Sequence, residues 1–473
     1  MARDVEATQT EVAIVGAGTG GYVAAIRAAQ LDFDVTLVEA GEFGGTCLNF
    51  GCIPSKALIH ATNVAYEADD AEEMGVYADP DVDFGEMVDW KDGVVDTLTG
   101  AVEKLCKANR VNIVEGWATF EDEHSLTVDL ADEEGTAAFE FDHAIVATGS
   151  RPIEIPGFEF DGEHILSSRH ALDLTELPEE LVVVGAGYIG MELSMIFAKL
   201  GVDVTVIEML EELLPGYDRD LTQPVEKRAA DLDIKFQFGE AANDWWETET
   251  GLVLETETKD GENFEYAADR AIVAVGREPV TDSANIDALG IDLDENGFVA
   301  TDHQGRTTQD HVFAIGDVAG EPLLAHAGSA EGLVAADAIA GGDASMAEKA
   351  VPAAVFTDPE IAMVGKSDAE AEDAGFETII GEFPFRSSGR ALSTGHDEGF
   401  LRIIGDAQTG TVLGARIVGP EASELIAELG LAVETGATVE DVAETIHTHP
   451  TLGEGTMEAA ENALGQAIHT LNR

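Results

Sequence analysis

The chain has 473 residues, 45% of them hydrophobic, and carries 93 Asp and Glu against 25 Lys and Arg, for a formal net charge of −68. At roughly 150 residues per domain, this length suffices for about three domains with ordinary buried cores. So acidic a surface repels phosphates, which argues against a nucleic-acid partner and against binding to an anionic membrane.

The acidity itself has two explanations, disorder and adaptation to salt. The acids are spread through apolar, glycine-punctuated segments, which favours a folded chain over a disordered one. At about 1 M salt the Debye length falls to roughly 3 Å, so the mutual repulsion of the acids is screened there. We therefore expect a halophilic protein made for a salt-rich cytoplasm.

No segment predicts a membrane span or a signal peptide. No stretch approaches the roughly 20 uncharged apolar residues of a membrane helix. The N-terminal segment MARDVEATQT has neither the basic start nor the apolar core of a signal peptide. We therefore expect a cytoplasmic location. The three cysteines are too few for a disulfide framework, so a pair of them is a candidate for catalysis or metal binding.

A dinucleotide-binding pattern opens the chain. An apolar run at 12–15 leads into the segment GAGTGG (16–21), an alanine-rich helical stretch follows, and a second strand ends at Glu39. The glycines allow a tight turn and a close approach of a pyrophosphate to the helix N-terminus, and the acid can accept hydrogen bonds from ribose hydroxyls. The residues expected to contact this first nucleotide are Gly16, Gly18, Gly21 and Glu39.

The same pattern returns in the middle of the chain. The segment LVVVGAGYIG (181–190) is followed by a helical stretch and a strand that ends at Glu208, and in both copies the acid lies 23 residues after the first glycine. Each copy also closes with a similar strand and turn, AIVATG (144–149) and AIVAVG (271–276). Two matched units predict two dinucleotide sites; a doubly wound sheet without a nucleotide is the alternative. The further contacts expected are Thr148 and Gly149 in the first unit and Gly185, Gly187, Tyr188, Gly190, Glu208, Val275 and Gly276 in the second.

The second site is expected to take NAD rather than NADP. Glu208 can accept a hydrogen bond from a ribose 2′-hydroxyl but would repel a 2′-phosphate. No Lys or Arg that could bind such a phosphate follows before Arg219.

Two cysteines lie five residues apart in the segment GGTCLNFGCIPSK (44–56). A proline and an apolar helical run follow Cys52, which places this cysteine near a helix N-terminus, where the helix dipole favours the thiolate. Lys56 follows one turn later on the same helix face. A zinc site and two buried free thiols are the alternatives, but zinc needs four ligands, and the remaining cysteine, Cys106, is isolated and expected in a core.

The cysteine segment, the two nucleotide motifs and the later segment TQDHVFAIGD (308–317) resemble the flavoprotein disulfide reductases of group I, over nearly the whole chain. The resemblance implies an α/β fold with two Rossmann-like dinucleotide-binding domains, one for FAD and one for NAD, plus a C-terminal α+β interface domain. It implies no metal. The implied domains are 1–150 for the first part of the FAD domain, 151–276 for the NAD domain, 277–350 for the second part of the FAD domain and 351–473 for the interface domain.

The resemblance also implies roles for single residues. Cys47 would attack the substrate disulfide, and Cys52 would be the thiol on the flavin side, which forms a charge-transfer complex. Lys56 would lie beside the flavin N5 with Glu192 as its partner; two solvated helix charges are the alternative for this pair. Asp317 would bind the ribityl chain, and its alternative is a turn or cap residue. The remaining FAD contacts implied are Thr46, Lys56, Gly316 and Ala325, the last at the start of a helix that faces the flavin.

Near the C-terminus, the segment IHTHPTLGE (446–454) resembles the family signature HPTxxE. His449 would then be the acid–base residue and Glu454 its orienting partner. The chemistry needs such a group, because a dithiol must lose protons to form a disulfide, and histidine titrates near neutral pH. His447 is expected to be a neighbour or a packing residue. In the family this histidine reaches the cysteines of the other subunit, which implies a homodimer.

Among the branches of the family, the chain resembles most the enzymes that oxidise dihydrolipoamide, free or on a lipoyl-carrying protein, with NAD as acceptor. It lacks the NADP-reading arginines of glutathione reductases and the C-terminal cysteine pair of mercuric reductases. An NADH-dependent reductase of another low-molecular-weight disulfide is the alternative enzyme, and a structural or sensory flavoprotein is the non-enzymatic alternative. The chain departs from the family at Phe50, where valine is more common, and at Val280.

Overall fold

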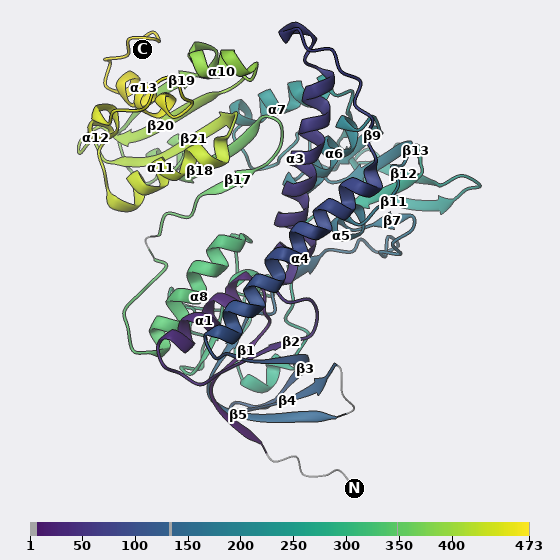
Figure 1. The fold of residues 1–473 in the computed structure, drawn as a ribbon, viewed down its shortest axis with the longest axis vertical. Helices are drawn as coiled ribbons and strands as arrows, with labels where there is room; N and C mark the ends of the chain where they lie inside the picture. Colours follow the sequence, from purple (N-terminus) through teal and green to yellow (C-terminus); the bar gives the residue numbers. More distant parts are fainter. Residues whose placement is uncertain (1–6, 132–134, 348, 473) are drawn as a thin grey trace.

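The computed structural model describes residues 7–131, 135–347 and 349–472, which form two α/β units and an antiparallel unit near the C-terminus (Figure 1). In the first unit a parallel sheet runs in the order β3-β2-β1-β5-β16, and β4 pairs antiparallel with the outer halves of β3 and β5. Its elements are β1 (Thr8–Val15), α1 (Thr19–Gln30), β2 (Val35–Glu39), α2 (Gly45–Phe50), α3 (Cys52–Asp69), η1 (Glu72–Met74), α4 (Phe84–Ala108), β3 (Asn112–Asp122), β4 (Ser125–Leu130), β5 (Thr136–Val146), η2 (Ile286–Leu289), β16 (Val312–Ala314), η3 (Gly316–Val318) and α8 (Ala325–Ile339).

The central strand β1 is apolar on both faces because both faces are covered. Val12 and Ile14 point into a core that they share with α1 and α8, and Ala13 and Val15 point into a core shared with the antiparallel strands. This is the pattern expected of a buried parallel strand. The expected core position of Cys106 is confirmed, because this residue is fully buried in the core that Val12 and Ile14 share with α1 and α8.

Helices α1 and α8 lie side by side (Figure 1) and approach closely because glycines face each other across the contact. A Cβ atom added to Gly332 would lie 2.6 Å from the carbonyl oxygen of Gly20, well inside van der Waals contact. Helices α3 and α4 form a long pair that leads from the first unit toward the second (Figure 1), where α3 contacts α6. The cysteine segment ends in the first turns of α3, and both cysteines line a cleft together with Tyr188 and Glu192 of the second unit.

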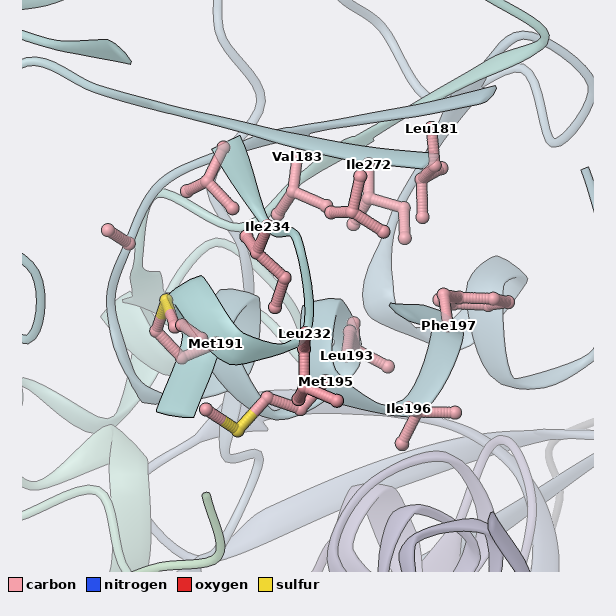
Figure 2. Packing of buried hydrophobic residues seen from close by; sticks show 14 of the residues in the cluster. Leu181, Val183, Met191, Leu193, Met195, Ile196, Phe197, Leu232, Ile234 and Ile272 are labelled. Carbon is pink, nitrogen blue, oxygen red and sulfur yellow. The ribbon is translucent and has the colours of Figure 1, made fainter. Parts of the chain in front are cut away.

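The second unit repeats the design of the first, with a five-stranded parallel sheet in the order β10-β9-β8-β14-β7 and a three-stranded antiparallel sheet, β11-β12-β13. Figure 2 shows its core, in which Leu181, Val183 and Ile272 of the sheet face Leu193 and Phe197 of helix α6. Its elements are β7 (Ile165–Leu166), α5 (Ser168–Leu172), β8 (Glu180–Val184), α6 (Tyr188–Lys199), β9 (Asp203–Glu208), α7 (Arg219–Asp231), β10 (Lys235–Phe238), β11 (Glu240–Glu247), β12 (Leu252–Thr258), β13 (Asn263–Ala268) and β14 (Arg270–Val273).

A two-stranded ribbon of β6 (Ser150–Pro152) and β15 (Arg277–Pro279) joins the two units where the chain enters and leaves the second one. A long connection after α8 then leads to the third unit (Figure 1), an antiparallel sheet in the order β17-β18-β21-β20-β19. Its elements are β17 (Ala353–Val355), β18 (Glu360–Gly365), α9 (Asp368–Asp373), β19 (Thr378–Pro384), η4 (Phe385–Ser387), α10 (Gly389–Thr394), β20 (Phe400–Asp406), β21 (Val412–Gly419), α11 (Ala422–Thr435), α12 (Val439–Glu444) and α13 (Glu454–Ala463).

Helices α11 and α13 pack on the sheet of the third unit. A Cβ atom added to Gly381 of β19 would lie 1.9 Å from the carbonyl oxygen of Ala459, so α13 lies directly on the backbone of this strand. The C-terminal signature ends at Glu454, the first residue of α13, so the packing of α13 on the sheet holds this end of the signature in place. Within the described ranges, no helix is both long enough and apolar enough to cross a membrane.

Candidate active site

The first glycine motif forms the turn between β1 and α1. Gly16 has a φ of +104°, and a Cβ atom on Gly21 would lie 1.9 Å from the carbonyl oxygen of Gly16. A larger residue at either position would push the helix away from the strand. The Glu39 carboxylate closes the turn from the neighbouring strand, because it accepts hydrogen bonds from the backbone N–H groups of Ala17 at 2.6 Å and Gly41 at 2.8 Å.

The second motif has the same geometry, residue for residue. Gly185 has a φ of +106°, and a Cβ atom on Gly190 would lie 2.0 Å from the carbonyl oxygen of Gly185. The Glu208 carboxylate accepts hydrogen bonds from the N–H groups of Ala186 at 2.8 Å and Leu210 at 2.9 Å. The repeat that was detected in the sequence is therefore also a repeat of main-chain conformation.

Both motifs fit a dinucleotide. A Cβ atom added to the middle glycine of each motif, Gly18 or Gly187, would have no heavy atom within 4 Å. The open space lies at the N-termini of α1 and α6, where free N–H groups and the helix dipole favour a pyrophosphate. We call each glycine turn, together with the N-terminus of the helix that follows it, a cradle. Each cradle thus offers an anion site, and the adjacent strand carries a carboxylate, Glu39 or Glu208, as the candidate ribose ligand.

A cleft leads from the first cradle to the cysteines. The predicted residues that line it are Gly18, Gly21, Thr46, Cys47, Cys52, Lys56, Gly149, Tyr188, Glu192, Gly316, Asp317 and Ala325. A second cavity, of about 830 Å³, lies over the second cradle and is lined among others by Gly185, Gly187, Tyr188, Glu208, Val275 and Gly276. The two cavities share Tyr188 and Arg277, so they meet there. Four predicted contacts line neither cavity: Gly16, Glu39, Thr148 and Gly190. The Thr148 hydroxyl donates instead to the carbonyl oxygen of Val280 at 2.7 Å.

The two cysteines are free thiols at the junction of α2 and α3. Cys52 is the first residue of the 18-residue helix α3, as the sequence predicted. A hydrogen bond from Cys47 and the charge of Lys56 lower the pKa of Cys52 to about 7, although burial acts in the opposite direction. The same hydrogen bond and burial raise the pKa of Cys47. Of the two thiols, Cys52 is therefore the one that ionises first, with Cys47 as the protonated donor.

Lys56 and Glu192 form an ion pair between helices α3 and α6, with 2.8 Å between Nζ and Oε2. Glu192 is only 5% exposed, so the alternative of two solvated helix charges is wrong. Its other oxygen, Oε1, accepts the backbone N–H of Phe356 at 2.9 Å, and the Phe356 ring lies 4.4 Å from the Lys56 ammonium. Sequence reasoning missed Phe356, which lies 164 residues from Glu192 and has no motif of its own.

Asp317 belongs to a polar group that sequence reasoning found only in part. The Ser150 hydroxyl donates a hydrogen bond to the Asp317 carboxylate. Arg277 donates to the Ser150 hydroxyl at 2.8 Å and to its carbonyl oxygen at 2.7 Å. Ser150 and Arg277 directly follow the closing glycines of the two repeated units, and this equivalent position was the signal that could have found them.

His449 and Glu454 form the pair that the signature predicts, with His449 Nδ1 2.8 Å from Glu454 Oε1. The second Glu454 oxygen accepts the N–H of Thr451 at 2.8 Å. Burial raises the pKa of Glu454, but these two hydrogen bonds outweigh it and hold the pKa below its usual value. The His449 side chain is 81% exposed and does not line the cysteine cleft of its own chain.

His447 has a different environment. Its ring is largely buried and lies between the carbonyl oxygen of Thr445, 2.9 Å from Nδ1, and the Glu428 carboxylate, 3.0 Å from Nε2. Both ring nitrogens are thus used within the third unit, so His447 anchors the segment that presents His449. Among the described residues, no group of three or more His, Cys, Asp or Glu side chains is arranged to hold a metal ion.

Comparison with known proteins identifies the family. Residues 10–332 match the family model described as pyridine nucleotide-disulphide oxidoreductase, and residues 351–460 match the dimerisation domain of the same family. The chain belongs to the pyridine nucleotide-disulphide oxidoreductases. It is thus a flavoprotein disulfide oxidoreductase that uses FAD and NAD, and it has the dimerisation domain of that family. The expected α/β fold with two Rossmann-like units is confirmed.

Individual relatives match the chain over nearly its whole length. Proteins named dihydrolipoyl dehydrogenase are 61% identical in Halobacterium salinarum, over 98% of both chains, and 59% identical in Haloferax volcanii, over 99% of both. A protein of the same name from Geobacillus stearothermophilus is 46% identical over 99% of both chains. Among solved structures, LpdA from Mycobacterium tuberculosis superposes with a TM-score of 0.90 at 28% identity, covering 96% of this chain and 99% of LpdA.

Proposed function

We propose that the protein is a dihydrolipoyl dehydrogenase, which oxidises dihydrolipoamide to lipoamide and reduces NAD to NADH. The observation that carries the proposal is the cysteine pair at the end of the first cradle, with a donor thiol at Cys47 and a stabilised thiolate at Cys52. The names of the relatives that are 59–61% identical support the choice of substrate.

The oxidation of a dithiol suits this asymmetric pair when it starts as the Cys47–Cys52 disulfide. One substrate thiolate attacks the sulfur of Cys47, the disulfide bond breaks, and Cys52 leaves as a thiolate. The second substrate sulfur then attacks the sulfur that is bound to Cys47, which closes the cyclic disulfide and releases Cys47 as a thiol. The product side thus holds one thiol and one thiolate, so one of the two substrate protons passes to a base. FAD, when bound, supplies a two-electron acceptor beside Cys52, with NAD as the final acceptor.

We assign the base to His449. Its Nδ1 faces the Glu454 carboxylate, which can only accept, so the ring proton lies on Nδ1 and Nε2 is the basic nitrogen. The exposure of His449, its absence from the cleft of its own chain and its place in the dimerisation domain support a homodimer in which each chain supplies this histidine to its partner. A lipoyl-carrying protein would be the natural source of the substrate.

We assign the remaining predicted residues by their place in the two cavities. The cleft with Thr46, Gly316 and Asp317 is proposed for FAD, with Lys56 and Glu192 beside its reactive end. The cavity over Gly187 and Glu208 is proposed for NAD. We also propose domain boundaries near residues 150 and 276, supported by the ribbon of β6 and β15 at these crossings, and near residue 350, just before β17. A cytoplasmic location and the absence of a nucleic-acid partner stay predictions of the composition.

The test is an anaerobic titration of the purified holoenzyme in molar salt, with dihydrolipoamide first and NAD second, followed by absorption spectroscopy. We expect a long-wavelength charge-transfer band to appear with the dithiol and to disappear when NAD is added. A flavin that NADH reduces but dihydrolipoamide does not would overturn the substrate assignment and would favour a reductase of another disulfide.

A further inference from the structure

A short segment between β17 and β18, residues 356–358, lies along one face of helix α6. Three residues of α6, spaced three and four apart on this face, contact the segment: Glu192, Met195 and Lys199. Glu192 accepts the N–H of Phe356 at 2.9 Å, and Met195 Sδ accepts the N–H of Asp358 at 3.2 Å. Lys199 Nζ lies 2.8 Å from the Asp358 carboxylate. The segment is thus held at three points, one on each turn of the helix.

Asp358 is the anchor of this contact. Its Oδ2 binds Lys199 at 2.8 Å and Arg228 Nε at 2.9 Å, and Lys199 also donates to Asn63 Oδ1 at 2.6 Å. Burial raises the pKa of Asp358, but the two cations outweigh it and hold the pKa below its usual value. The network joins α3 of the first unit, α6 and α7 of the second unit and the start of the third. Lys199 is only 5% exposed, so the loss of one partner would leave a buried charge without compensation.

The other end of the segment contacts the redox centre. Glu192 binds Lys56 with one oxygen and the N–H of Phe356 with the other, and the Phe356 ring lies 4.4 Å from the Lys56 ammonium. The charge of Lys56 in turn favours the thiolate of Cys52. Phe356 and Asp358 are two residues apart in one short segment, so a displacement of Asp358 can be transmitted to Phe356.

We propose that Asp358 is a positioning residue of the redox centre: through its ion pairs with Lys199 and Arg228 it holds Phe356 against Glu192 and so keeps Lys56 in place beside Cys52. The proposal deepens the proposed function, on which the role of the cysteine pair rests. Because the segment continues into β18, the same network also fixes the third unit, which carries His449, on the nucleotide-binding units.

The test measures the thiolate of Cys52 directly, without turnover. In a Cys47→Ser background with FAD bound, the rate of Cys52 alkylation by iodoacetamide is followed against pH in molar salt. We expect Asp358→Asn to shift the midpoint upward by about half a pH unit or more, because Lys56 is no longer held beside the thiolate. In the chain with both cysteines, we expect the same substitution to lower kcat by about tenfold with a KM changed less than about twofold.

An exposed ion pair between the second and third units provides the control. Lys227 of α7 pairs with Glu398, before β20, and their side chains are 60% and 57% exposed. Lys227→Met is expected to leave the Cys52 midpoint and kcat unchanged. Lys199→Met keeps the pair of Arg228 with Asp358, so it tests the proposal even if Asp358→Asn does not fold, and it should shift the midpoint in the same direction by a smaller amount.

An unchanged Cys52 midpoint in folded Asp358→Asn or in Lys199→Met would overturn the proposal. An equal shift in Lys227→Met would also overturn it, because the effect would then belong to any contact between these units. The alkylation uses no dihydrolipoamide, so a wrong substrate assignment would leave its outcome unaffected.

Discussion

Glu39 and Glu208 hold equivalent positions in the two repeated units, and each carboxylate accepts the N–H of the residue after the first glycine of its motif. Each acid therefore holds its glycine turn in place through backbone hydrogen bonds. The two sites nevertheless differ beyond the turn, because the first leads to the cysteines and the second opens into the cavity of about 830 Å³.

For the second site this predicts a loss of nucleotide discrimination in Glu208→Gln. The amide still fills the position but no longer repels a 2′-phosphate, so the ratio of kcat/KM for NAD to that for NADP should fall by about tenfold or more. Steady-state kinetics with both nucleotides provide the measurement. Glu39→Gln is the matched control, expected to weaken FAD retention without changing this ratio. An unchanged ratio in Glu208→Gln would show that another residue reads the ribose.

The asymmetry of the cysteines predicts different spectra for their serine variants. Both Cys47→Ser and Cys52→Ser should lose essentially all lipoamide turnover while they retain FAD. Only Cys47→Ser should keep a long-wavelength band, and this band should grow as the pH rises, because the Cys52 thiolate is the absorbing partner and Lys56 still favours it. Absorption spectra across a pH series check this. A long-wavelength band in Cys52→Ser instead would show that Cys47, and not Cys52, is the thiol on the flavin side.

The exposure of His449 predicts complementation between subunits. His449→Gln and Cys47→Ser should each be inactive as homodimers, with a loss of about 10²-fold or more for the histidine variant. If the two variants are unfolded together and refolded at equal concentration, about half the dimers carry both chains, and one of their two sites combines an intact histidine with intact cysteines. About a quarter of the normal activity should therefore return. No recovery in mixed dimers, isolated with two different affinity tags, would place the histidine and the cysteines on one chain.

The charge of −68 predicts a requirement for salt. In about 10 mM salt the Debye length is near 30 Å, so the acidic surface repels itself across a large part of the molecule. We expect dialysis from molar salt to release FAD and to reduce the circular dichroism signal, with recovery when salt is restored. As a control, sucrose is added at the same osmolarity in place of salt, and it should not restore the circular dichroism signal. Full activity and an unchanged spectrum after dialysis would contradict this explanation of the composition.

Local patterns in the sequence were enough to predict the two nucleotide-binding units, the position of Cys52 at a helix start and the family. These features depend on residues close in sequence: a buried strand, a glycine turn and a helix are each encoded within about 30 residues. The pairs Lys56–Glu192 and His449–Glu454 both came from the resemblance. The first joins residues 136 apart, which spacing alone does not relate, and the second lies within one short signature.

Only the tertiary structure revealed the contacts of Phe356, the network of Asp358 and the link from Arg277 through Ser150 to Asp317. In each case the partners lie more than 100 residues apart and belong to different elements, so no local periodicity or spacing relates them. Their geometry depends on how the three units pack, and a buried ion pair is stable only when that packing brings its charges together. The sequence thus determined which chemistry the chain carries, and the packing of the units decided which side chains hold that chemistry in place.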